Sequence, residues 1–177
     1  MMEEIRTGGC EAWEDRIEPY FERPYWVVDI LPVQVPAYSP GQYFAVEEYF
    51  LQEPRLSELR RKYLELLLKL NCYFDMQTAA ERNPRPEALE ELVMSRAVYA
   101  LFEEEHTLCV LNFDDTNLTV YDPSERFRGM LELLAGAEGL FFWQPPQEAL
   151  DEAGGAKQST IVGSARRGTQ DVSAPQR

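Results

Sequence analysis

Short apolar stretches, separated by polar or proline-containing segments, recur along the chain. A continuous apolar run, or an alternation of apolar and polar side chains, is typical of a β-strand, because a strand places successive side chains on opposite faces. Pro24 and Pro32 bound the first of these stretches, and Pro123 ends another. The pattern predicts strands at 25–31, 71–76, 98–102, 107–113, 117–122 and 140–143.

Other segments have the 3.6-residue spacing of amphipathic helices. The clearest is 55–70, where leucines and Tyr63 recur along one face, with Pro54 suited to the first turn. Its solvent side is expected to carry three cations, Arg60, Arg61 and Lys62. The spacing predicts helices near 44–70, 87–95 and 125–135, and Ser124 is expected to cap the last of them. A short helix or irregular arm is expected to lay Trp13 on the domain.

These elements predict an α+β fold with a mostly antiparallel sheet of about five or six strands and helices packed mainly on one face. The segments 98–102, 107–113 and 117–122 are expected to form a three-stranded meander. Because 98–102 is apolar on both faces, it is expected to be a central strand. One face of the meander is expected to carry Leu108, Val110, Leu118 and Val120.

The character of the sequence changes after about residue 150. Residues 1–150 read as a single acidic domain, whereas 151–177 are rich in Gly, Ser, Ala and Gln and are expected to be a disordered C-terminal tail. Residues 152–177 contain four cations and two anions, so the first 151 residues carry a net charge of −16.

The charge of the whole chain restricts its partners. Formal net charge is −14, from 31 acidic and 17 basic residues. Binding to a nucleic-acid backbone requires Lys and Arg to displace counterions, so no nucleic-acid partner is expected, and an anionic membrane surface is equally disfavoured. A basic protein would be attracted instead. The N-terminus lacks the apolar core of a secretory signal and no apolar run is long enough to span a membrane, so a cytoplasmic location is expected.

The three cysteines, Cys10, Cys72 and Cys109, form neither a disulfide framework nor a CxxC zinc motif. Cys72 and Cys109 lie in apolar, strand-like runs. We therefore expect both of these thiols to be buried and unreactive.

The only histidine, His106, begins a predicted strand that is followed by a hairpin and by Asp122-Pro123. This arrangement resembles a local pattern in papain-like cysteine peptidases of the bacteriocin-processing type, over about eighteen residues. The resemblance implies that His106 is general base to a cysteine, here Cys10, and that Asp122 or Asn117 orients the histidine. In that family a glutamine precedes the nucleophile, and none precedes Cys10. The alternative interpretation is an exposed or capping His106 in a turn after three glutamates.

An acidic group surrounds the predicted hairpin turn: Asp114, Asp115, Asn117 and Asp122. Carboxylates bind hard cations such as Ca²⁺ and Mg²⁺, but this stretch lacks the twelve-residue spacing and the glycine of a calcium-binding loop. Asp and Asn also favour turns, because their side chains bond to nearby backbone groups. We expect turn formation here, with no metal and no cofactor.

Aromatic residues crowd the first fifty positions, interleaved with carboxylates. Such a surface can bind a protein, since aromatic anchors supply much of the energy of an interface; the favoured interpretation is that these residues form the core with the 55–70 helix. The leading functional hypothesis is a non-catalytic protein that binds a protein with a basic surface, as an inhibitor or immunity-type partner of a basic toxin would. The alternative is a thiol hydrolase that uses Cys10, His106 and Asp122. A small-molecule-binding domain has no positive signal in the sequence, and the oligomeric state is not predicted.

Overall fold

The computed structural model of the chain describes residues 8–146, with side-chain surroundings from residue 12 onward. The elements follow in the order α1 (Gly8–Ile17), the 3-10 helix η1 (Glu18–Tyr20), β1 (Tyr25–Asp29), α2 (Tyr43–Phe50), α3 (Arg55–Asn71), α4 (Pro86–Ser95), β2 (Val98–Phe102), the 3-10 helix η2 (Glu103–Glu105), β3 (Thr107–Leu111), β4 (Leu118–Tyr121), α5 (Glu125–Ala137) and β5 (Phe141–Trp143). Ser124 caps α5 as expected, because its hydroxyl accepts the Phe127 N–H at 3.1 Å.

Five antiparallel strands form one sheet in the order β2-β3-β4-β1-β5, which confirms the predicted α+β fold. The expected meander of β2, β3 and β4 is present. The prediction that Leu108, Val110, Leu118 and Val120 share one face is wrong, because Cys109 pairs with Val120 and Leu111 with Leu118. Directly paired residues point to the same side of a sheet, so Leu118 and Val120 face away from Leu108 and Val110.

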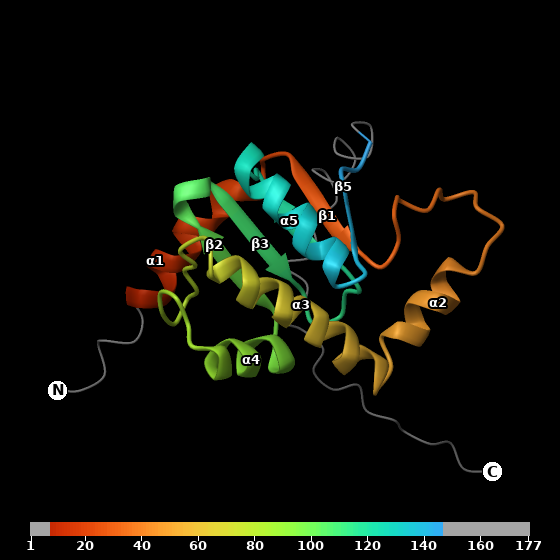
Figure 1. The fold of residues 1–177 in the computed structure, drawn as a ribbon, viewed down its shortest axis with the longest axis horizontal. Coiled ribbons are helices and arrows are strands. Elements are labelled where there is room, and N and C mark those ends of the chain that lie inside the picture. The colour runs from red at the N-terminus through yellow and green to blue at the C-terminus, as the bar shows by residue number, and fades with distance from the viewer. Residues whose placement is uncertain (1–7, 147–177) are drawn as a thin grey trace, which may run out of the picture. The chain divides into compact units, whose positions relative to one another are not determined.

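Helices cover both faces of the sheet, unequally (Figure 1). The larger core lies between the sheet and α3, α4 and α5, and includes Leu66, Leu67 and Phe127, all three fully buried. A smaller cluster on the opposite face places Trp13 of α1 and Tyr20 of η1 against Leu108 and its neighbours. The expectation that Trp13 lies on the domain is confirmed.

Two strand predictions are wrong. β2 is an edge strand rather than a central one; it is apolar on both sides because helices cover both faces. The segment 71–76 is not a strand, because α3 continues to Asn71 and the chain then turns. Phe74 and Met76 are apolar because they are buried in the core, and only Gln77 forms a bridge to β2, at Leu101.

Arg60 lies on the buried side of α3, with 2% of its surface exposed, so its predicted place on the solvent side is wrong. Its guanidinium donates to the backbone carbonyls of Val93 and Arg96 at the end of α4, and to those of Asn112 and Phe113 after β3, at 2.5–3.2 Å. The last carbonyls of a helix have no partner within the helix, and a cation there is favourable. Arg60 thus joins α3, α4 and the β3–β4 loop.

Tyr63, one turn further along α3, fixes the other side of the same loop. Its side chain is fully buried, and its hydroxyl lies 2.7 Å from the carbonyl oxygen of Thr116 and 3.2 Å from that of Val28. One face of α3 therefore holds both the β3–β4 loop and the end of β1 in place.

The predicted tail and the domain boundary near residue 150 lie outside the described residues. Within residues 8–146, no helix combines the length and the apolar character that crossing a membrane requires.

Candidate functional site

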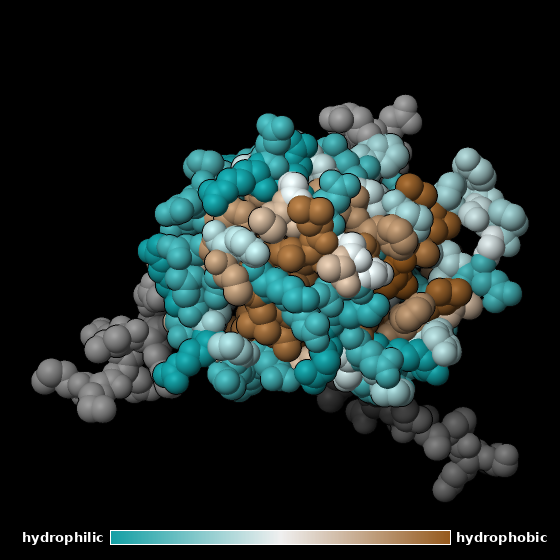
Figure 2. Space-filling view, viewed as in Figure 1, coloured by the Kyte–Doolittle hydropathy of each residue, from teal (hydrophilic) through white to brown (hydrophobic). Residues whose placement is uncertain are grey.

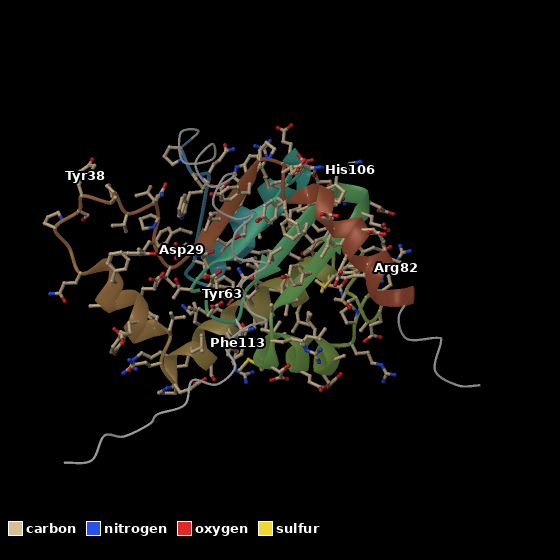
Figure 3. All side chains as sticks on the ribbon, turned by 180° about the vertical axis from the view of Figure 1, so that it is seen from behind. Asp29, Tyr38, Tyr63, Arg82, His106 and Phe113 are labelled. Carbon is tan, nitrogen blue, oxygen red and sulfur yellow. The ribbon has the colours of Figure 1, made fainter. Side chains whose placement is uncertain are left out.

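His106 ends the short η2 helix between β2 and β3. Its backbone is left-handed, with φ 51°, and its N–H donates to the Glu103 carbonyl at 3.1 Å. The side chain is exposed, at the end of the molecule opposite Tyr38 in the view of Figure 3. The interpretation of His106 as an exposed turn residue is confirmed.

Asp122 lies at the same end of the sheet as His106, because Leu108 and Tyr121 pair at the start of β3 and the end of β4. The Asp122 carboxylate accepts a hydrogen bond from Arg23 at 2.8 Å, and no hydrogen bond between described residues joins it to His106. Asn117 precedes β4 and therefore lies at the opposite end of the strand. The structure thus gives Asp122 a partner other than the histidine.

The cysteines occupy different environments. Cys109 is buried in β3 as expected, and burial raises the pKa of its thiol well above the ordinary value. Cys72 is exposed, so its predicted burial is wrong; it follows the last turn of α3, and its sulfur lies 3.4 Å from the Leu68 carbonyl oxygen. Cys10 belongs to α1, but its side chain lies outside the described surroundings, and the Cys10, His106 and Asp122 arrangement stays a prediction.

The acidic turn between β3 and β4 is held by its own polar groups. The side-chain amide of Asn112 donates to the Asp115 carboxylate at 2.6 Å, and Tyr63 bonds to the backbone of the buried Thr116. In the described part of the chain, no group of three or more His, Cys, Asp or Glu side chains is arranged to hold a metal ion. These contacts fit the expected role of the segment in forming a turn.

The most exposed apolar surface lies on residues 31–50, called the arm below, which comprise the loop after β1 and helix α2. None of the eight residues of α2 is buried, and the helix extends away from the sheet toward the right of Figure 1. Exposed fractions are 89% for Tyr38, 80% for Phe44 and 52% for Tyr49, and Val33 and Val46 are exposed as well. Hydrophobic residues are visible at the surface in the corresponding region of Figure 2.

The favoured interpretation of the N-terminal aromatics holds for Trp26, which packs against the core that contains the α3 leucines, but not for the arm. Trp13 and Tyr20 are buried, but on the sheet face opposite α3, and Tyr38, Phe44 and Tyr49 are not in a core at all. The arm aromatics instead contact one another: Tyr43 and Phe44 have ring centroids 5.3 Å apart, and Tyr49 and Phe50 5.7 Å. The aromatic residues of the first fifty positions therefore divide into buried ones and ones exposed on the arm.

Three carboxylates gather where the arm joins the domain: Asp29, Glu47 and Asp115. Tyr43 donates to Glu47 at 3.0 Å, and burial, that hydrogen bond and the three negative charges raise the pKa of Tyr43 to about 12. Burial also raises the pKa of Asp29 above its ordinary value, with a smaller contribution from Glu47, while backbone N–H donors act in the opposite direction. No described cation forms an ion pair with any of the three carboxylates.

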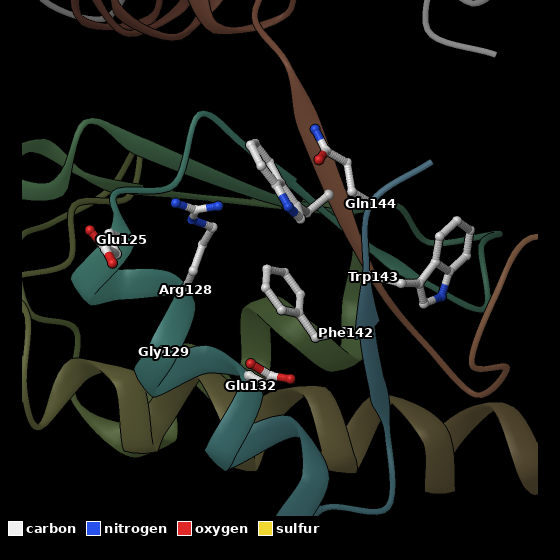
Figure 4. A pocket seen from close by; sticks show the side chains of 8 residues that line it. Glu125, Arg128, Gly129, Glu132, Phe142, Trp143 and Gln144 are labelled. Atoms are coloured by element: carbon white, nitrogen blue, oxygen red, sulfur yellow. The ribbon is translucent and has the colours of Figure 1, made fainter. Parts of the chain in front are cut away.

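A separate hollow of about 430 Å³ lies between α5 and strands β1 and β5, open to solvent (Figure 4). Trp26 and Phe142 line it from the sheet, and Arg128, flanked by Glu125 and Glu132, from α5. The arginine carbon Cζ lies 5.3 Å from the centroid of the Trp26 ring. This hollow is distinct from the arm.

Comparison of the chain with family models, with curated proteins and with solved structures gave no significant match.

The described residues therefore offer two candidate surfaces, the arm and the hollow. Sequence reasoning missed the hollow, because Trp26 of β1 lies far along the chain from the residues of α5 and β5 that complete it. A usable signal existed for the arm: α2 is apolar on several sides, with Phe44 and Tyr49 outside the stripe of Tyr43, Val46 and Phe50. A helix with apolar residues all round must be covered by something.

Proposed function

We propose that this protein binds another protein that carries a basic surface, and that the arm is the binding surface. The observation that carries the proposal is the exposure of large apolar and aromatic side chains on a helix that buries none of its residues. Monomeric soluble proteins rarely expose large contiguous apolar patches, and aromatic residues in such patches are typical anchors of protein interfaces.

The charge around the arm supports a basic partner. No Lys or Arg occurs between Arg23 and Arg55, whereas that interval contains Asp29, Glu47, Glu48 and Glu53. Positive charge on the partner would accelerate its association with the arm. It would also pair with carboxylates that form no ion pair in the described structure. An immunity or inhibitor protein of a basic toxin is one type of protein with these properties.

One arm variant and one matched control variant test the proposal. Phe44→Ser with Tyr49→Ser removes the aromatic anchors, and Leu133→Ser removes a residue of α5 that is 73% exposed. The full-length protein and each variant are immobilised and exposed to cell lysate at low ionic strength, and retained proteins are identified, purified and titrated calorimetrically. A basic protein that the arm variant binds at least about ten-fold more weakly, and Leu133→Ser binds normally, supports the proposal.

The electrostatic part has its own control. Neutralising Glu47 and Glu48 to glutamine should slow association at low salt, whereas the same change at Glu87 and Glu91 of α4 should have little effect. If no basic protein is retained, or if the Phe44→Ser/Tyr49→Ser variant binds the retained protein as tightly as Leu133→Ser does, the arm is not a binding surface.

A further inference from the structure

Arg128 lines the hollow, and one of its hydrogen-bond donors lacks an acceptor. Its Nε atom is buried and has no hydrogen-bond partner, and no described carboxylate lies within ion-pair distance of its guanidinium. A buried donor without an acceptor is unfavourable and is rare in native structures. Figure 4 shows the Arg128 side chain extending from α5 on the side where Phe142 also lies, and its Cζ atom is 5.3 Å from the centroid of the Trp26 ring. Because Nε itself is buried, an acceptor in the hollow would pair with the rest of the guanidinium, which forms no ion pair with a described carboxylate.

A glycine keeps the helix side of the hollow open. Gly129 lies inside α5, where glycine is less favourable than alanine by about 1 kcal/mol. A Cβ atom at this position would meet no atom within 4 Å, so packing does not require the glycine. A side chain at this position would enter the hollow, since Gly129 is one of its lining residues.

We infer that the hollow binds a zwitterionic α-amino acid with an apolar side chain. The carboxylate of the ligand accepts hydrogen bonds from Arg128, its ammonium group pairs with Glu132 or Glu125, and its side chain lies against Trp26 and Phe142. Neither glutamate forms an ion pair with a described cation, so both are available.

The charges in the hollow select this class of ligand. One guanidinium and two carboxylates disfavour dianions such as phosphate esters, and the −14 charge of the chain adds to the repulsion. A zwitterion satisfies the arginine without adding net negative charge. The hollow, at about 430 Å³, falls in the range of roughly 300–1,000 Å³ typical of small-ligand sites. Because it is open, a dissociation constant on the order of 1 mM is expected.

The test is a titration of the full-length protein with L-phenylalanine, followed by NMR at the Trp26 indole N–H and the Arg128 Nε–H. Two further probes each lack one charge: N-acetyl-L-phenylalanine has no ammonium group, and L-phenylalanine amide has no carboxylate. Arg128→Gln removes the guanidinium that pairs with the ligand carboxylate. Gly129→Leu fills the hollow and also favours the helix. The matched control is Arg55→Gln, because Arg55 of α3 also stacks on an aromatic ring, that of Tyr49 in the arm, but does not line the hollow.

The expected result is a saturable shift with L-phenylalanine in the wild type and in Arg55→Gln, and its loss in Arg128→Gln and Gly129→Leu. Each singly charged probe should bind at least about ten-fold more weakly. No saturable shift, or an equal shift in Gly129→Leu, would overturn the site. Equal binding of N-acetyl-L-phenylalanine would overturn the zwitterionic class. Circular dichroism of each variant separates loss of binding from loss of folding, and no residue of the arm is substituted in this test.

Discussion

Replacing Arg60 with methionine should destabilise the protein strongly. Methionine preserves most of the apolar stem and removes the guanidinium, so four backbone carbonyls lose their charged donor. Because Arg60 is only 2% exposed, water cannot replace that donor unless the end of α4 or the β3–β4 loop opens.

The magnitude follows from these contacts. A hydrogen bond to a charged group contributes about 1.5–3 kcal/mol, and four bonds from one group are not additive, so the expected loss is about 3–5 kcal/mol. Such a loss is a large part of the 5–15 kcal/mol by which domains are typically stable, and it should lower Tm by roughly 10–20 °C.

The assay is urea unfolding of the full-length protein, followed by far-ultraviolet circular dichroism and extrapolated linearly to water. Arg61→Met is the matched control, because the neighbouring Arg61 is exposed and forms an ion pair with Glu90 at 3.4 Å; its loss should cost less than about 1 kcal/mol. Arg60→Lys, which keeps the charge but not the planar fork, should fall between the two. A loss below about 1 kcal/mol in Arg60→Met, with an unchanged denaturant slope, would refute the reasoning.

Three further outcomes are expected. Tyr63→Phe should cost about 1–3 kcal/mol in urea unfolding, because it leaves a buried carbonyl without its hydroxyl donor. Asp29→Asn should stabilise the protein at pH 7 by about 1 kcal/mol or less, since the folded state raises the pKa of the carboxyl group; the gain should disappear in acid, where the wild-type Asp29 is protonated, and a constant gain would contradict this cause. Cys10 should react with iodoacetamide no faster than the exposed Cys72, with or without His106→Ala. Rapid alkylation of Cys10 at pH 6 that His106→Ala abolishes would instead establish the hydrolase arrangement.

The local sequence pattern predicted where helices and strands occur better than it predicted how they are arranged in the sheet and the core. The helix at 55–70 and the meander strands were predictable, because each has its own periodicity over enough residues to be distinctive. The position of β2 at the edge of the sheet was not predictable from its composition. Apolar residues on both faces of a strand indicate that helices cover both faces, but they do not indicate how many strands pair with it. The apolar character of 71–76 was similarly misleading, because Phe74 and Met76 fill the core from a turn.

Arg60 illustrates a different limit. An amphipathic stripe assigns every charged residue to solvent, and that rule is correct for its neighbour Arg61. It fails at Arg60 because the carbonyl oxygens that satisfy the guanidinium lie 33–53 residues away, at the end of α4 and after β3. No local pattern contains that information, so only the tertiary arrangement reveals the contact.

The exposed apolar surface of the arm and its negative charge together restrict the kind of partner that could cover it. An uncovered aromatic helix would favour association between copies of the same chain, yet two arms in contact would bring Glu47 and Glu48 of each copy together without a cation from the arm itself. Like charges placed across an interface are costly, so the carboxylates oppose self-association and leave a basic partner unopposed. Since no residue of α2 is buried, its aromatics contribute little to the core. Substitution there should therefore leave stability almost unaffected, so that any loss of the proposed binding would not come from unfolding.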